Sequence, residues 1–257
     1  MRLSSVLTVL ICLFAHCAIA QERAYFVTYD HYLEERGTLE IAIATTTGFP
    51  KGGDSAYTAP WLELEYGLTG WRWENRFRPL KTEHRINPVI YVEYENINEA
   101  SRIQKEIVGS GRLHYDHISE LREEHVHELE GKLILSSAVR GWNIAENFVI
   151  EKNMSEDEGL EFGYSVGVSR SLGGLASGTN CHFCRENFVV GAELYGGLGS
   201  SQESGLTDTR HYIAPVFAWH VSDKSTFKVS TGFGLTNASD RVLLRVGYAY
   251  ELPIGGR

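Results

Sequence analysis

The sequence has no long hydrophobic run beyond its first 20 residues. After Ala20, no stretch approaches the roughly 18 consecutive apolar residues that a transmembrane helix needs. A chain without such a helix either crosses a membrane as a closed β-barrel, whose backbone N–H and C=O groups pair between strands, or does not enter it. Two classes of protein therefore remain: a transmembrane β-barrel and a protein that does not enter the membrane.

Basic residues are also scarce. The 257 residues contain 24 Lys and Arg against 33 Asp and Glu, giving a formal net charge of −9, and no basic stripe is present. Nucleic-acid binding needs such a stripe, so we expect no nucleic-acid partner. Charged residues make up 22% and aromatic residues 11% of the chain, which argues against a disordered protein.

Catalytic motifs are missing as well. The sequence contains no G-x-S-x-G elbow, no H-E-x-x-H pair and no glycine loop placed before a helix to hold a phosphate. The glycine-rich stretch 196–199 ends a predicted strand, so we interpret it as a bend. Because no nucleophile–base pair can be named, we predict that the protein is not an enzyme and holds no cofactor.

Only two cysteines follow residue 20, and they form the pair Cys181 and Cys184. In an oxidising compartment, a C-x-x-C pair in a loop favours a small local disulfide. A redox motif is the weaker alternative, since such motifs usually open a helix between two strands. The pair is also half of a zinc site, and Arg185 stands where a c-type haem site needs a histidine.

Residues 1–20 have the build of a signal peptide. Arg2 precedes an apolar run from Val6 to Ala15, and the small-x-small site Ala18–Ala20 precedes Gln21. An uncleaved anchor is the alternative, but the run is short for a membrane span. Cys17 lacks a good lipobox because His16 precedes it. We therefore predict a signal peptide over residues 1–20 and a single domain over residues 21–257.

Apolar residues alternate with small or polar ones, with a period of two, along most of this domain. Val242, Leu244, Val246, Tyr248 and Tyr250 alternate with small or charged residues, which is typical of a strand with two different faces. Similar alternation predicts about ten to twelve strands, several near the length that crosses a bilayer at a tilt. The weakest candidates are Ala24–Asp30, Trp71–Phe77 and Trp142–Ile150.

The longest predicted connection is polar and covers residues 96–126. Within and beside it, Ile118–Leu129 has helical spacing and predicts a short helix. Histidines and glutamates cluster there: His114, His117, Glu120, Glu123, Glu124, His125, His127 and Glu128. A transition-metal site is one interpretation; a solvated charged loop is favoured because the spacing matches no metal motif.

Two features favour a barrel in lipid over a soluble β-sandwich. The less apolar face mixes glycines and small residues with isolated charges, namely Glu193, Arg241 and Arg245. Such a face suits the curved interior of a barrel, so we predict that these three charges line it. Aromatic residues also gather at predicted strand ends, as interfacial girdles do: Trp61, Trp71, Trp73, Trp142, Tyr212, Trp219, Tyr248 and Tyr250.

One residue conflicts with this scheme. Glu146 falls on the apolar face of Trp142–Ile150, where a carboxylate facing lipid is costly. A bulge or a position near the interface would relieve the conflict; otherwise the predicted register is wrong.

Several runs of the chain resemble a family of uncharacterised bacterial outer-membrane β-barrel, porin-like proteins. The resemblance rests on Trp61–Phe77, Asn87–Ile97 and Leu129–Leu135 and extends over most of the domain. It implies a fold and a location but no substrate and no functional residue. Relatives have an extra strand or hairpin between Tyr66 and Trp71, where this chain has only Gly67–Gly70, so the resemblance leaves the strand number open.

The sequence therefore predicts an all-β protein: an antiparallel up-and-down transmembrane β-barrel exported to the cell outer membrane. Its expected role is porin-like or transport-related with an unidentified small-molecule solute. The expected partners are outer-membrane lipid and, during export, the barrel assembly machinery, although the chain continues past Tyr250 instead of ending on an aromatic residue. The alternative is a soluble periplasmic or secreted β-sandwich that serves as a binding module.

Overall fold

The structure is a computed structural model that describes residues 24–30, 38–52, 55–66, 75–80, 82, 84–98, 125–155, 159–175, 187–202, 205–206 and 208–254. Its strands are β1 (Thr38–Phe49), β2 (Tyr57–Tyr66), β3 (Asn75–Phe77), β4 (Asn87–Asn98), β5 (His125–Val139), β6 (Trp142–Asn153), β7 (Glu161–Ser171), β8 (Phe188–Ser200), β9 (His211–Ser222), β10 (Ser225–Gly234) and β11 (Val242–Pro253). One short 3-10 helix, η1 (Leu172–Leu175), follows β7.

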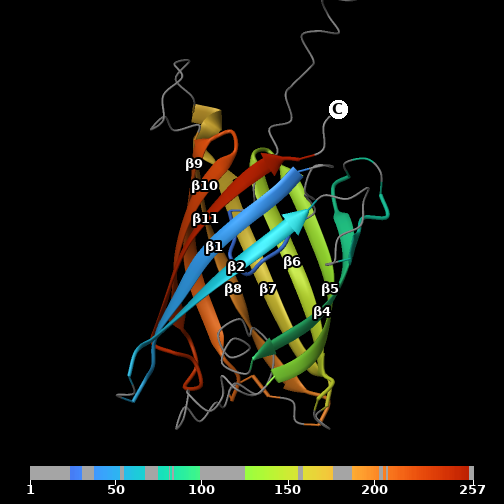
Figure 1. The fold of residues 1–257 in the computed structure, drawn as a ribbon, viewed down its shortest axis with the longest axis vertical. Helices are drawn as coiled ribbons and strands as arrows, with labels where there is room; N and C mark the ends of the chain where they lie inside the picture. Colours follow the sequence, from blue (N-terminus) through green and yellow to red (C-terminus); the bar gives the residue numbers. More distant parts are fainter. Residues whose placement is uncertain are drawn as a thin grey trace, which may run out of the picture.

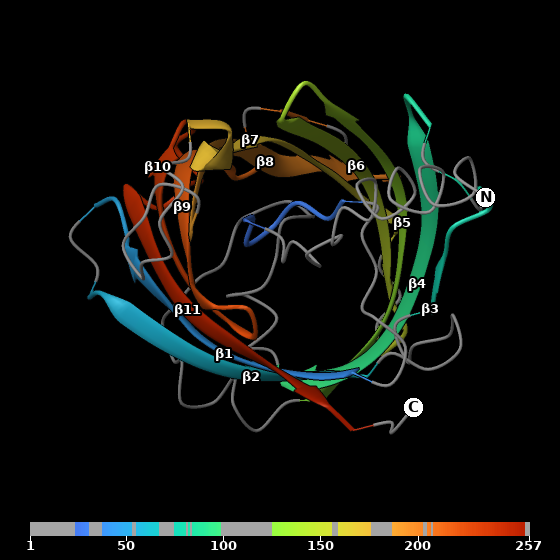
Figure 2. The same ribbon diagram turned by 90° about the horizontal axis from the view of Figure 1, so that it is seen from above.

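The strands form a single antiparallel sheet of eleven strands in the order β2-β1-β11-β10-β9-β8-β7-β6-β5-β4-β3. This sheet curls into a barrel (Figures 1 and 2). Two hairpins are tight: Arg140 and Gly141 join β5 to β6 with φ of 54° and 79°, as a type I′ turn requires, and Asp223 and Lys224 join β9 to β10. We call this end of the barrel the turn end and the opposite end the loop end.

The barrel has a seam. β2 and β3 are the edges of the sheet, and no hydrogen-bonded pairing joins them within the described ranges. Counting the antiparallel steps along the sheet shows that β2 and β3 both run parallel to β11. The predicted antiparallel up-and-down barrel of ten to twelve strands is confirmed, with eleven described strands. Their odd number leaves two edges with the same direction, so the sheet does not close among the described residues.

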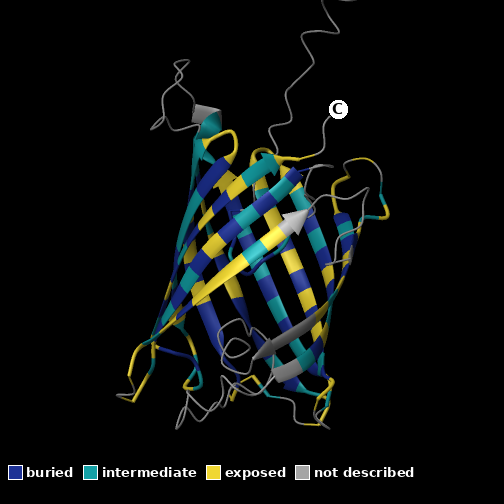
Figure 3. Cartoon of the chain, viewed as in Figure 1, coloured by how far each residue is buried: buried dark blue, intermediate teal, exposed yellow. Residues whose placement is uncertain are grey.

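Burial alternates along the strands, as Figure 3 shows. In β1 and in nearly all of β7, each buried residue is followed by a half-buried or exposed one. Successive Cβ atoms point to opposite faces, so one face lines the interior and the other covers the outside. The outer face carries exposed apolar side chains, among them Ile43, Leu62, Leu133, Phe148, Ile150, Ile213, Phe217 and Phe233.

The aromatic prediction is half correct. Trp142, Trp219, Tyr248 and Tyr250 lie on the outer face near the turn end. Phe188 stacks on Phe217 there and lies at a tilt against Trp219. The positions of two others were wrong. Tyr212 is 3% exposed and points inward, and Trp61 is on the inner face because it pairs in register with the buried Ala44. Trp71 and Trp73 lie outside the described residues.

Two predicted elements are corrected, and a third is confirmed where it is described. Ala24–Asp30 forms no strand, although its residues alternate. The end of the predicted helix Ile118–Leu129 is in β5, which begins at His125; the rest of that helix, like most of the connection 96–126, is outside the described residues. Of Trp71–Phe77, only Asn75–Phe77 is described, as β3.

Glu146 occupies the position that the alternation of β6 predicts. The register of β6 with β5 and β7 runs without a bulge at this point, and Glu146 stands opposite Leu135 and Val166 on the exposed face. The register was therefore correct, and the outer face carries a carboxylate among apolar neighbours.

Candidate functional site in the barrel interior

The interior of the barrel holds the segment Ala24–Asp30, which we call the inner segment (Figure 2). Its residues pack against one strand after another. Ala24 contacts Val189 and Ala218, and Tyr25 contacts Ala145 and Val216. Further along, Val27 joins a cluster with Tyr195, Tyr212, Ala214 and Leu243. The inner segment therefore crosses the interior and touches opposite walls.

Glu193 anchors the middle of this segment. Its carboxylate on β8 accepts hydrogen bonds from three consecutive backbone N–H groups: Phe26 at 3.3 Å, Val27 at 2.9 Å and Thr28 at 2.7 Å. The side chain is 1% exposed. Successive N–H groups that converge on one anion form a nest, and bonds to a charged acceptor are stronger than neutral ones. Glu193 thus holds the chain where no neighbouring strand pairs with it.

Asn147 on β6 holds the next residue at two points. Its Oδ1 accepts a hydrogen bond from the Tyr29 N–H at 2.6 Å, and its Nδ2 donates to the Tyr29 carbonyl at 2.8 Å. Ser165 also donates to Asn147 Oδ1, at 3.2 Å. The amide side chain therefore replaces the backbone of a partner strand, which explains why an alternating segment remains outside the sheet.

The rings of Tyr25 and Phe26 pack closely against glycines of the barrel wall. A Cβ atom on Gly167 would lie 2.7 Å from Cε1 of Tyr25, and one on Gly247 would lie 3.0 Å from Cε1 of Phe26. The Tyr25 hydroxyl donates to Asn143 at 3.1 Å, and Asn143 Nδ2 donates to Asp30 Oδ2 at 3.3 Å.

Two cations surround the ring of Tyr29. The Arg76 guanidinium lies 4.5 Å and the Lys132 ammonium 4.3 Å from its centroid, within cation–π distance. The neighbouring ring of Tyr91 lies 5.4 Å away and faces the same two cations, at 5.5 Å and 4.4 Å. Lys132 also pairs with Glu130 at 2.6 Å. The end of the inner segment is thus held by charge as well as by packing.

The three charges predicted for the interior occupy different positions. Glu193 and Arg245 are on the inner face, and Arg245 is 8% exposed with its guanidinium 5.2 Å from the ring of Tyr195. Arg241 differs: it precedes β11, is exposed, and lies in the connection after β10 at the loop end. Cys181 and Cys184 lie outside the described residues.

Sequence reasoning missed most of the residues that hold the inner segment. Asn143 and Asn147 are buried or half-buried inside a strand, although asparagine is depleted in strands. Two asparagines four residues apart on the less apolar face of β6 were therefore a usable signal. Arg76 and Lys132 gave no such signal, because their contact depends on how β3 and β5 face Tyr29.

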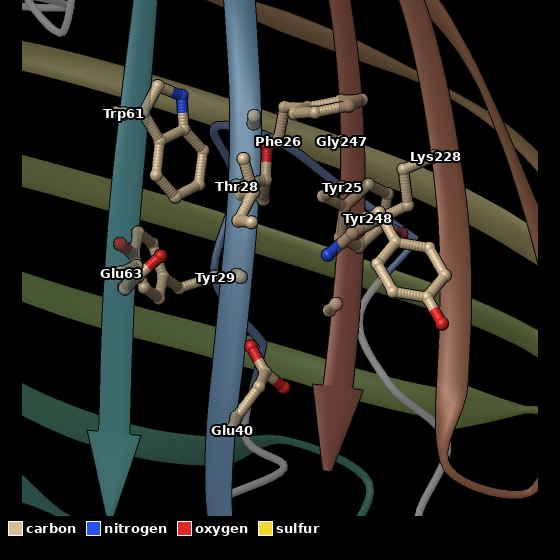
Figure 4. Close-up of a pocket in the computed structure, with 14 residues that line it drawn as sticks. Tyr25, Phe26, Thr28, Tyr29, Glu40, Trp61, Glu63, Lys228, Gly247 and Tyr248 are labelled. Atoms are coloured by element: carbon tan, nitrogen blue, oxygen red, sulfur yellow. The ribbon is translucent and has the colours of Figure 1, made fainter.

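A cavity lies between the inner segment and the wall formed by β1, β2, β10 and β11 (Figure 4). Its polar lining includes Glu40, Glu63 and Lys228, and Trp61 lies at its edge on β2. The described residues contain no helix long and apolar enough to cross a membrane. Within the same part of the chain, no group of three or more His, Cys, Asp or Glu residues is arranged to hold a metal ion.

No family model and no curated protein matches the chain. Among solved structures, an outer-membrane channel from Pseudomonas putida F1 is similar with a TM-score of 0.47 and 9% identity, covering 86% of this chain and 97% of that one. The toluene transporter TbuX of Ralstonia pickettii gives 0.39 and 8%, covering 86% and 90%. The NanC porin gives 0.38 and 10%, covering 83% and 100%.

These solved structures are outer-membrane β-barrels with low similarity to this chain. The fold class therefore rests on the strand order and on the two faces of the sheet. Together they define an antiparallel up-and-down transmembrane β-barrel with an internal N-terminal segment.

Proposed function

We propose that this protein is an outer-membrane β-barrel with a transport-related role, whose interior is kept narrow by its own inner segment. The observation that carries the proposal is the contrast between the two faces of one sheet. The outside exposes apolar side chains strand after strand, and the inside carries carboxylates, cations, hydroxyls and amides. A water-lined path through lipid needs an apolar outer face and a polar inner face.

The outer face supports insertion into a bilayer. Phe148, Ile150 and Leu133 on adjacent strands are 52%, 44% and 45% exposed. Each apolar Å² taken out of water is worth about 25 cal/mol, so a band of such side chains gains from contact with hydrocarbon. Export through a signal peptide over residues 1–20 belongs to this proposal.

The soluble alternative does not fit the sheet. A β-sandwich buries its apolar side chains between two stacked sheets. Here the described strands form one sheet, and the same side chains point away from the interior.

The first test is location. Outer-membrane fractions should contain the protein, and its electrophoretic mobility should change on boiling because an unheated barrel keeps its compact shape in detergent. Recovery from the periplasm without detergent, with no change in mobility, would contradict the proposal.

The second test is conductance in planar bilayers. We expect a small conductance from the wild-type protein and a larger one from Glu193→Gln, because the substitution removes the charge that strengthens the three hydrogen bonds and sets an NH2 donor in place of one acceptor oxygen. Glu146→Gln makes the same change on the outer face and should conduct like the wild type. If neither the wild type nor Glu193→Gln conducts, the transport role is refuted.

A further inference from the structure

The inner wall carries more acidic than basic side chains. Among strand residues whose side chains are described, nine inward carboxylates are opposed by four inward cations. The carboxylates are Glu40, Glu63, Glu93, Glu128, Glu130, Glu151, Glu161, Glu193 and Glu251, and the cations are Arg76, Lys132, Lys228 and Arg245. Asp30 on the inner segment adds a further buried carboxylate.

Four of the carboxylates form a row near the loop end. Glu93 stands opposite Glu130, Glu130 opposite Glu151, and Glu151 opposite Glu161, so the row crosses β4, β5, β6 and β7. Directly opposed like charges destabilise a sheet, so this row is not explained by sheet stability. Any solute entering from the loop end passes a wall of fixed negative charge.

A second acidic group lies near the turn end, on the opposite wall. Glu40 on β1 stands opposite Glu251 on β11, and Glu63 follows on β2 opposite Ala42. Glu40 and Glu63 line the cavity beside the inner segment, with Lys228 across from them (Figure 4). Acidic side chains therefore lie near both ends of the interior.

Three of the four inner-wall cations lie against aromatic faces. Lys132 and Arg76 lie over Tyr29 and Tyr91, and Arg245 lies over Tyr195. These contacts show that the tyrosine faces of the interior already accept positive groups, and one of the cations, Lys132, also pairs with Glu130 of the acidic row. They also fix the cations at particular points of the wall, while the carboxylates extend from end to end.

We infer that the interior of this barrel favours small cations and cationic solutes over anions. This inference rests on the proposed transport role. Fixed carboxylates concentrate cations and exclude anions because the low-dielectric wall focuses their field, and rings of acidic side chains are the usual selectivity device of cation channels.

The test is the reversal potential across a planar bilayer with a potassium chloride gradient, measured on Glu193→Gln to increase the current. We expect a potential of the sign that potassium preference gives. Adding Glu151→Gln and Glu161→Gln should lower the potassium-to-chloride permeability ratio by roughly a factor of two, and lower salt should enlarge the difference. Adding Glu146→Gln, which removes an outward carboxylate, should leave the ratio unchanged.

The outcomes separate the two proposals. A chloride preference, or equal ratios with and without Glu151→Gln and Glu161→Gln, would overturn the cation preference alone. A complete lack of conductance in variants that keep heat-modifiable mobility would overturn the transport role and the cation preference with it.

Discussion

The two faces of this sheet are built by different rules, although they alternate along the same strands. The outer face of β6 carries Trp142, Ile144, Phe148 and Ile150, which need only be apolar. Its inner face carries Asn143 and Asn147, which must reach particular atoms of the inner segment. The outside is therefore tolerant of apolar exchange, and the inside depends on individual hydrogen bonds.

The largest effect that this contrast predicts is a charge on the outer face. Phe148→Arg, near the middle of β6, should destabilise the folded barrel by about 2–4 kcal/mol because it places a cation in hydrocarbon. Denaturant unfolding in lipid vesicles measures the loss. Phe148→Leu is the matched control and should cost much less; equal losses for both would show that Phe148 makes specific contacts and does not simply face lipid.

A smaller effect is expected from an added methyl group inside. Gly167→Ala places a Cβ atom 2.7 Å from the Tyr25 ring, so the inner segment must shift at a cost of about 1–3 kcal/mol. Bilayer conductance should rise as the segment moves. The control is Gly131→Ala, whose Cβ would meet its nearest atom at 3.8 Å. A conductance equal to wild type in Gly167→Ala would contradict the seating of Tyr25.

Replacing a glutamate by leucine should raise the free energy of unfolding on the outer face and lower it on the inner face. Glu146→Leu removes a carboxylate from the apolar face and should stabilise the barrel by up to about 1 kcal/mol. Glu193→Leu removes the acceptor of three N–H groups and should destabilise it. Unfolding midpoints of the two variants under identical conditions compare them, and a loss of stability in Glu146→Leu would mean that this carboxylate has a partner.

The smallest expected effect is the loss of one hydroxyl. Tyr25→Phe removes the bonds to Asn143 and should cost roughly 1 kcal/mol or less. Tyr248→Phe, on the outer face, is the control and should be nearly neutral. Unfolding in lipid measures both, and indistinguishable midpoints would show that the Tyr25 hydroxyl contributes little to holding the inner segment.

Alternation was enough to predict the outer face. Val190 and Leu194 on β8 and Val242, Leu244 and Val246 on β11 point as their spacing indicated, and even Glu146 follows the pattern. The alternation predicts this face because a side chain in contact with hydrocarbon needs only to be apolar and to lie at every second position of the strand. It failed for Ala24–Asp30, where the same period occurs but side chains of other strands satisfy the backbone.

The interior could be predicted only in part. Glu193 and Arg245 were identified from their period, but the partner of Glu193 is a segment far away in sequence. Arg241 shares that period with Arg245 and still lies outside the strand, because β11 begins one residue later. The resemblance left the strand number open at Gly67–Gly70, and the edges at β2 and β3 with their common direction follow only from the pairing.

The most direct test of the whole account is spin-label accessibility along β6. Single cysteines at Asn147, Phe148, Val149 and Ile150, with Cys181 and Cys184 replaced by serine, report contact with lipid-soluble oxygen and a water-soluble nickel complex. The account predicts a period of two, with high oxygen contact at 148 and 150 and low oxygen contact at 147 and 149. Equal accessibility at all four positions, or a pattern with nickel contact highest at 148 and 150, would contradict it.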